Sequence, residues 1–430
     1  MHYRHRIADK LLENKLKGMG AVLVEGAKWC GKTTTAEQQA KSILYMDQPK
    51  DRAMNLQLAQ INPDLLLNGD TPRLIDEWQI APELWDAVRF TVDHREGDGQ
   101  FILTGSVTPL QDDEDVEQGK KIFHSGAGRI ARITMRPMTL WESGESCGQI
   151  SLEDLFGGSD KMVGINNLEL QDVVWLICRG GWPKAVDQDK DIALGRAFDY
   201  YDTVVNVDIK EPDGVVRNPE RVKLLMRSYA RNQGTQVSLT AISADMKAND
   251  RDTLDDRTVY SYLKALKSIF VVEDVKAWNP NLRSKSAIRS SDTRYFTDPS
   301  IAVAALGVGP TDLMSDLNTL GLFFETLCMR DLRVYAQALD GEVYHYRDSD
   351  GLECDAVVHL RNGSYGLIEI KLGGERLIEE GAKSLQKLAK KIDTTKMKTP
   401  SFLMVLTATG KYAFKREDGV WVVPIGTLKD

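Results

Sequence analysis

The residues of this chain that are best suited to chemistry form a glycine-containing loop near its beginning. Residues 26–33 read Gly-Ala-Lys-Trp-Cys-Gly-Lys-Thr, which is the spacing G-x-x-x-x-G-K-[ST] of a phosphate-binding loop. Glycines let the backbone turn tightly, so that successive N–H groups point at one anion. Lys32 supplies a cation for the β- and γ-phosphates of a nucleotide, and the Thr33 hydroxyl supplies a ligand for Mg²⁺. The predicted phosphate contacts are Gly26, Ala27, Lys28, Trp29, Cys30, Gly31, Lys32, Thr33 and Thr34.

The segments on either side of the loop support this prediction. Residues 21–25 are apolar and β-branched, as in a buried strand, and residues 34–42 are rich in Thr, Ala, Glu and Gln, as in a helix. Strand, loop and helix in this order are the context in which the motif binds phosphate, and the helix adds its positive end to the site. The alternative is a chance match in a glycine-containing loop, which would leave both flanking elements unexplained.

Two further apolar segments also end in polar residues. The stretch Leu-Ile-Asp-Glu predicts a strand that ends in the acidic pair Asp76 and Glu77. Asp76 would hold Mg²⁺ through its water shell, and Glu77 would polarise the attacking water of a nucleoside triphosphatase. Residues 100–106 predict a third strand, whose terminal Thr104 and Ser106 would sense the γ-phosphate. The alternative for the acidic pair is a solvated strand end.

Length and composition limit the classes of protein that fit. A chain of 430 residues is too long for one core, so two to four domains are expected. The net charge of −8 argues against wholesale wrapping of nucleic acid, although local basic faces remain compatible with it. The five cysteines are scattered without C-x-x-C spacing, which predicts reduced thiols and no structural zinc. No apolar run is long enough to span a membrane, so the sequence predicts a cytoplasmic protein.

Four stretches occur in an order that resembles a known family. They are GAKWCGKT, LIDEWQIAPELWDAVR, FILTGS and GAGRIARITMRPMTLWE. This order is similar to that of bacterial and archaeal AAA-type ATPases whose C-terminal portion is a widespread domain of uncharacterised function. The resemblance implies ATP and Mg²⁺ as cofactors, ATP hydrolysis, and a small helical lid on the nucleotide domain. Rings are common among AAA domains, so a homo-oligomer is a further hypothesis.

The resemblance also points to one arginine, and the chain departs from the family at two places. Arg129 would sense the γ-phosphate, in cis or from a neighbouring subunit, and so stabilise the transition state. The equally weighted alternative is a strand-edge arginine paired with a surface acid. Pro72 and Arg73 stand where the family usually has more apolar residues, so the strand that leads to the acidic pair is expected to be short. Trp29 and Cys30 are bulky for a phosphate loop, where they need contribute only N–H groups.

The middle of the chain predicts helices followed by a hairpin. An acidic stretch at 110–120 indicates a solvated loop, and glycines within 156–163 indicate a linker. Helices are expected at 168–178, 192–208, 237–246 and 257–266, and strands at 269–275 and 294–296. Helix, helix and hairpin are the order of a winged helix, with cations on or near the wing at Arg283, Lys285, Arg289 and Arg294. Contact with DNA and structural packing are both compatible with this pattern.

A second set of candidate catalytic residues lies near the end of the chain. Asp355 and Glu369 fall on adjoining predicted strands, 353–358 and 365–371, and Lys371 shares a face with Glu369. Two carboxylates can hold a divalent metal ion, and the ammonium can stabilise phosphate charge. This D…E-x-K arrangement resembles the PD-(D/E)XK nuclease-like core, in which a preceding helix often carries another acid, here Glu325. Beyond it, a helix is expected with Leu385, Leu388 and Ile392 inward and Lys387, Lys390 and Lys391 outward.

The combined prediction is an α/β chain of four parts. They are an AAA-type P-loop domain at 1–158, a helical lid at 159–235, a winged helix at 236–305 and a nuclease-like domain at 306–430. Three hypotheses for the whole remain open: an ATP-regulated enzyme that cleaves DNA, a regulatory switch that binds a partner without cleavage, and a DNA-remodelling motor. For the C-terminal domain alone, an active nuclease, a metal-binding but non-cleaving domain, and an inert docking domain also remain open.

Overall fold

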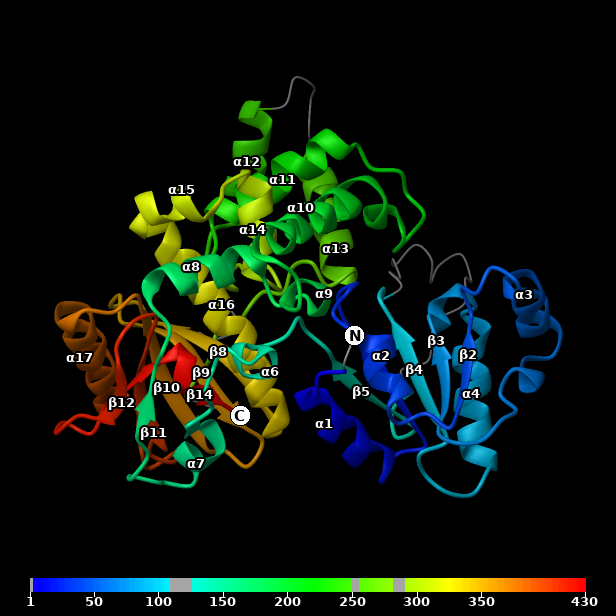
Figure 1. Cartoon of the computed structure of the whole chain (residues 1–430), viewed down its shortest axis with the longest axis horizontal. Coiled ribbons are helices and arrows are strands. Elements are labelled where there is room, and N and C mark those ends of the chain that lie inside the picture. The colour runs from blue at the N-terminus through cyan, green and yellow to red at the C-terminus, as the bar shows by residue number, and fades with distance from the viewer. Residues whose placement is uncertain (1–2, 109–125, 250–254, 281–290) are drawn as a thin grey trace. The chain divides into compact units, whose positions relative to one another are not determined.

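The computed structural model describes residues 3–108, 126–249, 255–280 and 291–430 (Figure 1). They form two compact units, and the chain passes between these units several times. The first unit contains residues 1–136, 208–216 and 265–270, and the second contains 137–207, 217–264 and 271–430. These boundaries differ from the four contiguous domains predicted from the sequence. The first stretch of the first unit ends at Arg136, and two later pieces of chain also belong to this unit. No helix in the described ranges is both long and apolar enough to cross a membrane.

The first unit is built around a parallel sheet in the order β2-β3-β4-β1-β5. Its strands are β1 Ala21–Glu25, β2 Ser42–Tyr45, β3 Arg73–Asp76, β4 Phe101–Gly105 and β5 Ile130–Thr134. Its helices are α1 Ile7–Leu16, α2 Lys32–Glu37, α3 Arg52–Ile61, η1 Pro63–Leu65, η2 Trp78–Ile80, α4 Glu83–His94 and η3 Asp208–Lys210. Figure 1 shows strands β2, β3 and β4 of this sheet next to one another, in blue to cyan.

Alternation along the strands gives this sheet a core on each face. Leu23 of β1 packs in one cluster with Val88 of α4, whereas the next residue, Val24, packs in another with Leu12 of α1. Successive side chains of a strand point to opposite faces, so a wholly buried strand must be apolar on both. The four buried residues of β1, Ala21–Val24, are all apolar, and the last residue, Glu25, is only partly buried. Because the strands themselves are buried, the polar residues lie at the carboxyl edge of the sheet, directly after the strands.

The second unit contains most of the helices. They are α6 Leu140–Ser143, α7 Leu152–Phe156, α8 Leu170–Arg179, α9 Pro183–Val186, α10 Lys190–Asn206, α11 Pro219–Arg231, α12 Leu239–Asn249, α13 Asp256–Ser268, α14 Pro299–Leu306, α15 Pro310–Ser315, α16 Leu317–Ala338, α17 Glu375–Lys391 and η5 Ile425–Thr427. The last residues of α13, from Ala265 onward, belong to the first unit. The helices predicted at 168–178, 192–208, 237–246 and 257–266 correspond to α8, α10, α12 and α13.

A mixed seven-stranded sheet, in the order β7-β12-β13-β11-β10-β9-β8, forms the other part of this unit. Its strands are β7 Gly164–Ile165, β8 Gly341–Arg347, β9 Glu353–Leu360, β10 Tyr365–Lys371, β11 Phe402–Thr407, β12 Tyr412–Lys415 and β13 Trp421–Pro424. A separate pair joins β6 Ile150–Ser151 to β14 Leu428–Lys429. Because β7 pairs with β12 and Phe156 packs on Phe402, the segment predicted as a linker at 156–163 lies between two elements that contact the C-terminal sheet.

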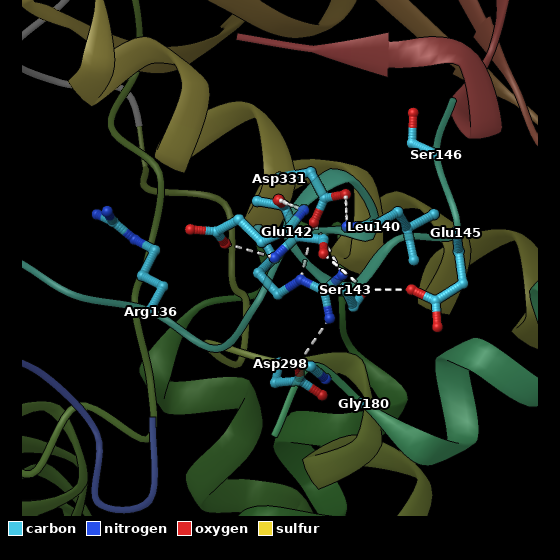
Figure 2. A network of polar contacts seen from close by, with 12 residues as sticks. Arg136, Leu140, Glu142, Ser143, Glu145, Ser146, Gly180, Asp298 and Asp331 are labelled. Atoms are coloured by element: carbon cyan, nitrogen blue, oxygen red, sulfur yellow. Dashed lines mark hydrogen bonds and ion pairs between the residues drawn. The ribbon is translucent and has the colours of Figure 1, made fainter. Parts of the chain in front are cut away.

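A buried ionic network joins α6, α14 and α16 in the second unit (Figure 2). The guanidinium of Arg330 donates to Asp298 at 2.9 Å and to Asp331 at 2.8 Å, and all three side chains are buried. Asp331 also accepts the backbone N–H of Leu140 at 3.0 Å, and Asp298 accepts that of Gly181 at 2.9 Å. Each carboxylate is thus shared between the arginine and a backbone donor, which compensates for removing these charges from water.

Three of the predicted local elements differ from the structure. The helix after the phosphate loop ends at Glu37 rather than at residue 42, because the chain enters β2 at Ser42. The strands predicted at 269–275 and 294–296 are only isolated antiparallel bridges in the described residues, between Val272 and Phe296 and between Val275 and Thr293. Phe270 adopts a φ of 58°, a left-handed conformation that interrupts any strand starting at residue 269.

The predicted basic wing also changes. Arg283, Lys285 and Arg289 lie outside the described residues. Arg294 is buried, and its guanidinium pairs with Asp274 at 2.6 Å, so it does not face solvent as a phosphate contact would. A winged helix therefore stays a prediction for this region, without Arg294 as one of its phosphate contacts.

Candidate functional site

The phosphate loop closes tightly against the end of β5. Gly26 has a φ of 150°, and a Cβ atom there would lie 2.0 Å from the carbonyl oxygen of Met135. Only glycine fits that approach. Lys32 is buried, and its ammonium donates to the carbonyls of Gly26 at 3.0 Å and of Ala27 at 2.9 Å. The ammonium predicted to meet the phosphates is thus folded back over its own loop.

The bulky loop residues occupy different environments. Cys30 is buried and its thiol points to the carbonyl of Met135 at 3.4 Å, whereas Trp29 is 42% exposed with a φ of 66°. Thr34 is exposed on the first turn of α2. The side chain of Cys30 therefore packs in the core and that of Trp29 is exposed, which is compatible with positions that contribute only N–H groups.

Thr33, Asp76 and Thr104 meet at the carboxyl edge of the first sheet. The hydroxyl of Thr33 donates to Asp76 at 2.7 Å, and the hydroxyl of Thr104 donates to the same carboxylate oxygen. Burial raises the pKa of Asp76, and these two hydrogen bonds oppose the increase. A hydroxyl and a carboxylate with oxygen donors fit a hard cation such as Mg²⁺, which takes few protein ligands and keeps water and phosphate oxygens for the rest.

Glu77 follows directly in a strained conformation. Its φ of 55° turns the chain out of β3, and its N–H donates to the hydroxyl of Thr104 at 3.2 Å. Its carboxylate accepts hydrogen bonds from the hydroxyl of Ser106 at 3.1 Å and from the amide of Gln79. The structure therefore brings the two predicted acids and the two predicted hydroxyls into one hydrogen-bonded chain.

A pocket of about 650 Å³ opens beside this hydrogen-bonded chain of side chains. Its lining residues are Lys28, Asp47, Arg52, Glu77, Gln79, Ile80, Pro82, Ser106, Val107, Glu211 and Pro212. Lys28, Asp47, Glu77 and Ser106 each come shortly after a different strand of the parallel sheet, so the strand ends place them on one edge. A cavity of this size, with several charged side chains in its lining, suits a small charged ligand.

Sequence reasoning assigned no role to four of the charged or polar residues in this lining, Asp47, Arg52, Gln79 and Glu211. Asp47 and Arg52 follow β2, which was not predicted as a strand, and Gln79 follows the acidic pair as a family feature to which no role was given. Glu211 lies 183 residues beyond Lys28, its hydrogen-bond partner. A polar residue directly after a short apolar run could have indicated Asp47, whereas no local pattern indicates Glu211.

Arg129 lies at the opposite edge of this sheet from the phosphate loop. It directly precedes β5, and its carbonyl accepts the N–H of Ala21, the first residue of β1. Its exposed guanidinium pairs with Asp93 at 2.7 Å. This placement argues against the predicted role in cis, because a phosphate held at the carboxyl end of β1 would be a whole strand length away. The role in a neighbouring subunit stays a prediction.

The second unit brings together the other predicted residues. Lys371 lies between two carboxylates, with its ammonium 2.6 Å from Glu369 and 3.2 Å from Asp355. Asp355 also accepts the N–H of Ile370 at 2.7 Å, and Glu369 accepts the hydroxyl of Ser384 at 3.1 Å. Because β9 and β10 are adjacent and antiparallel, residues far apart in the hairpin share one face.

Glu325 of α16 belongs to the same cluster. It accepts a hydrogen bond from the buried hydroxyl of Tyr295. Burial and then the negative charge of Asp355 raise the pKa values of both Glu325 and Glu369 to about 8. The described residues contain no group of three or more Asp, Glu, His and Cys side chains placed to hold a metal ion. A metal site made by Glu325, Asp355 and Glu369 therefore stays a prediction that requires Lys371 to move.

The helix after this hairpin is confirmed. In α17, Leu385 and Leu388 are buried, as is Ile392 directly after it, while Lys387 and Lys390 are exposed. Lys391 pairs with Asp348 and Asp350, each at 2.7 Å. All three predicted outward lysines are therefore exposed, and Lys391 is in addition paired with acids of the same unit.

The parallel sheet, with a phosphate loop after β1, an acidic pair after β3 and hydroxyls after β4, defines a P-loop nucleoside triphosphatase domain. Residues 19–143 match the model of a family described as an AAA domain, so this part of the chain is an AAA-type P-loop ATPase domain. Residues 170–312 and 320–428 match two families described as domains of unknown function, DUF8612 and DUF4143.

Similar proteins are known in other organisms. The uncharacterized proteins Mb2031c of Mycobacterium bovis and Rv2008c of Mycobacterium tuberculosis are each 24% identical over 378 residues, which cover 86% of this chain and 74% of the relative. Among solved structures, the Walker-type ATPase PABY2304 of Pyrococcus abyssi aligns with 13% identity and a TM-score of 0.40, over 69% of this chain and 94% of that one. The AAA match supports ATP binding and ATPase activity.

Proposed function

We propose that the first unit binds ATP with Mg²⁺ and hydrolyses it at the carboxyl edge of its sheet. The hydrogen-bonded chain of Thr33, Asp76, Thr104 and Glu77 beside the pocket carries this proposal. The loop N–H groups and Lys32 would bind the phosphates, and Thr33 with Asp76 would hold the metal ion. Mg²⁺, when bound, neutralises phosphate charge.

Each residue of the chain has a separate task in this reaction. Glu77 would orient the attacking water and take its proton, because it is the acid of the pair that lines the pocket. Ser106 and Gln79 hold that carboxylate in place through their hydrogen bonds. Asp76, held by two hydroxyls, stays next to Thr33 and leaves Glu77 free for the water.

The test of this proposal is ATP binding and phosphate release by wild type and by Lys32→Ala. Wild type should bind ATP and release phosphate only with Mg²⁺, and Lys32→Ala should lose both because the phosphates lose their buried cation. Phosphate release that persists in Lys32→Ala at the wild-type rate would overturn the assignment of the site.

A second candidate function concerns the second unit. The cluster of Asp355, Glu369 and Lys371 supports metal-dependent cleavage of phosphodiester bonds, with DNA as the substrate, once Lys371 moves off the two carboxylates that it bridges. The two carboxylates would bind the metal ion, and Lys371 would stabilise charge on the phosphate. On this proposal the helical lid, winged helix and nuclease-like parts present DNA to the cluster, and α17 adds Lys387 and Lys390 as phosphate contacts.

Cleavage of labelled single-stranded, duplex and branched DNA with Mg²⁺ or Mn²⁺, with and without ATP, tests this second function. Lys371→Ala should abolish the cutting, and Lys32→Ala should show whether ATP controls it. An intact ATPase that cuts none of these substrates would favour a regulatory switch or a DNA-gripping motor. Salt-dependent DNA affinity would then separate the two, because phosphate contacts weaken steeply with salt.

A further inference from the structure

One side chain of the phosphate loop is held by acids from a distant part of the chain. The ammonium of Lys28 lies 2.9 Å from Asp208 and 2.7 Å from Glu211. Asp208 is buried, and Lys28 and Glu211 are about one-third exposed, at 30% and 32%. All three belong to the first unit, in which η3 forms part of the returning segment 208–216.

This ion pair adjoins the proposed reaction site. Lys28 and Glu211 line the same pocket as Glu77 and Ser106. Lys28 is also the third residue of the loop whose N–H groups would bind the phosphates, so its flexible side chain starts close to the proposed phosphate site. Pro212 lines the pocket directly after Glu211, which places segment 208–216 at the wall of the site.

The charges at this wall do not suit a bound triphosphate. Asp208 and Glu211 each carry a negative charge when ionised, and a nucleotide would bring several more beside them. Burial lowers the pKa of Lys28, but its hydrogen bonds to Glu211 and Asp208 more than offset this and raise it, so the ammonium stays charged. The single positive charge of Lys28 can neutralise only one negative charge. Repulsion between the two carboxylates and an incoming phosphate therefore disfavours keeping all of them next to Lys28.

We propose that Lys28 is a second cation of the ATP site that contacts phosphate. Its ammonium pairs with Asp208 and Glu211 until the γ-phosphate of ATP replaces these two carboxylates. The two carboxylates thus take the place of phosphate oxygens around the Lys28 ammonium. When the γ-phosphate replaces them, segment 208–216 is released from the phosphate loop. This inference rests on the proposed ATP site and adds to it a residue that distinguishes ATP from ADP.

The experiment compares dissociation constants for ATP and ADP, measured with Mg²⁺ on the full chain. Lys28→Met should weaken ATP binding about tenfold and ADP binding less than about twofold, because a charge-assisted contact to the γ-phosphate is lost. Lys28→Arg should keep the preference for ATP. Glu211→Gln should strengthen ATP binding about threefold, because a competitor for Lys28 is removed. Glu13→Gln, which breaks an exposed ion pair with Lys17 on α1, is the matched control and should change neither constant.

Hydrogen exchange gives an independent readout in the wild-type protein. Amides of residues 208–216 should exchange faster with a non-hydrolysable ATP analogue than with ADP. Equal weakening of ATP and ADP in Lys28→Met would overturn the inference, as would unchanged exchange in 208–216. Failure of wild type to bind ATP at all would instead overturn the proposed function, so the two failures are distinguishable.

Discussion

The hydroxyl of Thr33 lies 2.7 Å from the carboxylate of Asp76, and this contact joins the end of the phosphate loop to the end of β3. The two residues are 43 positions apart in the chain. They meet because β1 and β3 are parallel and both flank β4, so their carboxyl ends lie at the same edge. The oxygen ligands proposed for Mg²⁺ therefore lie side by side.

The first prediction concerns Glu77, the acid that lines the pocket. Glu77→Gln should keep ATP affinity within about threefold of wild type and lower the turnover rate by about 100-fold, because an amide cannot accept the proton of the attacking water. Phosphate release and ATP binding measured on the same preparation check this. Glu96→Gln, at an exposed position of the same unit, is the control. Turnover near the wild-type rate would show that another group activates the water.

Gly26 gives a prediction about the loop itself. Gly26→Ala should lose ATP binding and lower the free energy of unfolding by about 2 kcal/mol or more, since its Cβ atom would lie 2.0 Å from the carbonyl oxygen of Met135. Thermal unfolding and ATP binding are the measurements. Gly18→Ala, where nothing lies within 4 Å of the added atom, should behave like wild type. Normal binding by Gly26→Ala would mean that the loop and β5 separate more easily than their close contact indicates.

Variants of Arg129 and Asp93 can separate the two remaining explanations of Arg129, which are a role in a neighbouring subunit and a surface ion pair. If Arg129 acts in a neighbouring subunit, Arg129→Ala should keep ATP binding and lower turnover about 1000-fold, with activity that depends on protein concentration. Asp93→Asn, which frees the guanidinium, should keep turnover. Equal turnover in wild type and Arg129→Ala would leave Arg129 as a surface ion pair and nothing more.

The buried network around Arg330 gives a prediction about stability. Arg330→Met should lower the free energy of unfolding by about 3 to 5 kcal/mol, because Asp298 and Asp331 would remain buried without their cation. The midpoint of chemical denaturation measures this change. Arg376→Met removes the arginine of an exposed pair with Glu380 and should cost less than about 1 kcal/mol. A triple variant that also carries Asp298→Asn and Asp331→Asn should regain part of the loss.

Burial of His345 predicts that the free energy of unfolding depends on pH. It is buried, its Nδ1 atom accepts from the amide of Gln236 at 3.1 Å, and its Nε2 atom donates to the carbonyl of Ser291 at 3.1 Å. Burial lowers the pKa of His345, so the folded protein resists its protonation. The stabilisation is present above the unfolded pKa of about 6.5 and is lost as pH falls through the lower folded value.

The measurement for His345 is the melting temperature of wild type and of His345→Asn at several pH values. The advantage of wild type over the variant should shrink between about pH 7.5 and about pH 5. His94→Asn, at an exposed position of α4, should show no such trend. A constant difference across this range would mean that His345 titrates alike in the folded and unfolded chains.

The sequence was sufficient for features that depend on neighbours in the chain. The strands at β1, β3, β4, β9 and β10 follow from apolar runs that end in polar residues or turns, and the placement of Lys371 beside Glu369 follows from the two-residue period of a strand. The helix after the phosphate loop was drawn too long because residues 34–42 contain no breaker, and only pairing of β2 with β3 reveals its end.

The remaining features depend on partners that are distant in sequence. Nothing near Lys28 indicates that Asp208 and Glu211, 180 and 183 residues later, will pair with it. Arg294 was expected on a basic wing because its neighbours are basic, yet Asp274 draws it into the interior. Arg129 follows a family pattern in sequence, but the direction of β5 places it at the edge away from the phosphates.

The discontinuous first unit has a consequence for synthesis of the protein. Residues 1–136 leave the ribosome first, but the acids that pair with Lys28 and the carbonyl of Ser268, which accepts the N–H of Thr108 at 2.9 Å, emerge only much later. At about 5 to 20 residues per second, the nascent parallel sheet waits several seconds or more for these pieces. The ATPase unit therefore cannot complete its folding during translation until residue 270 has been released.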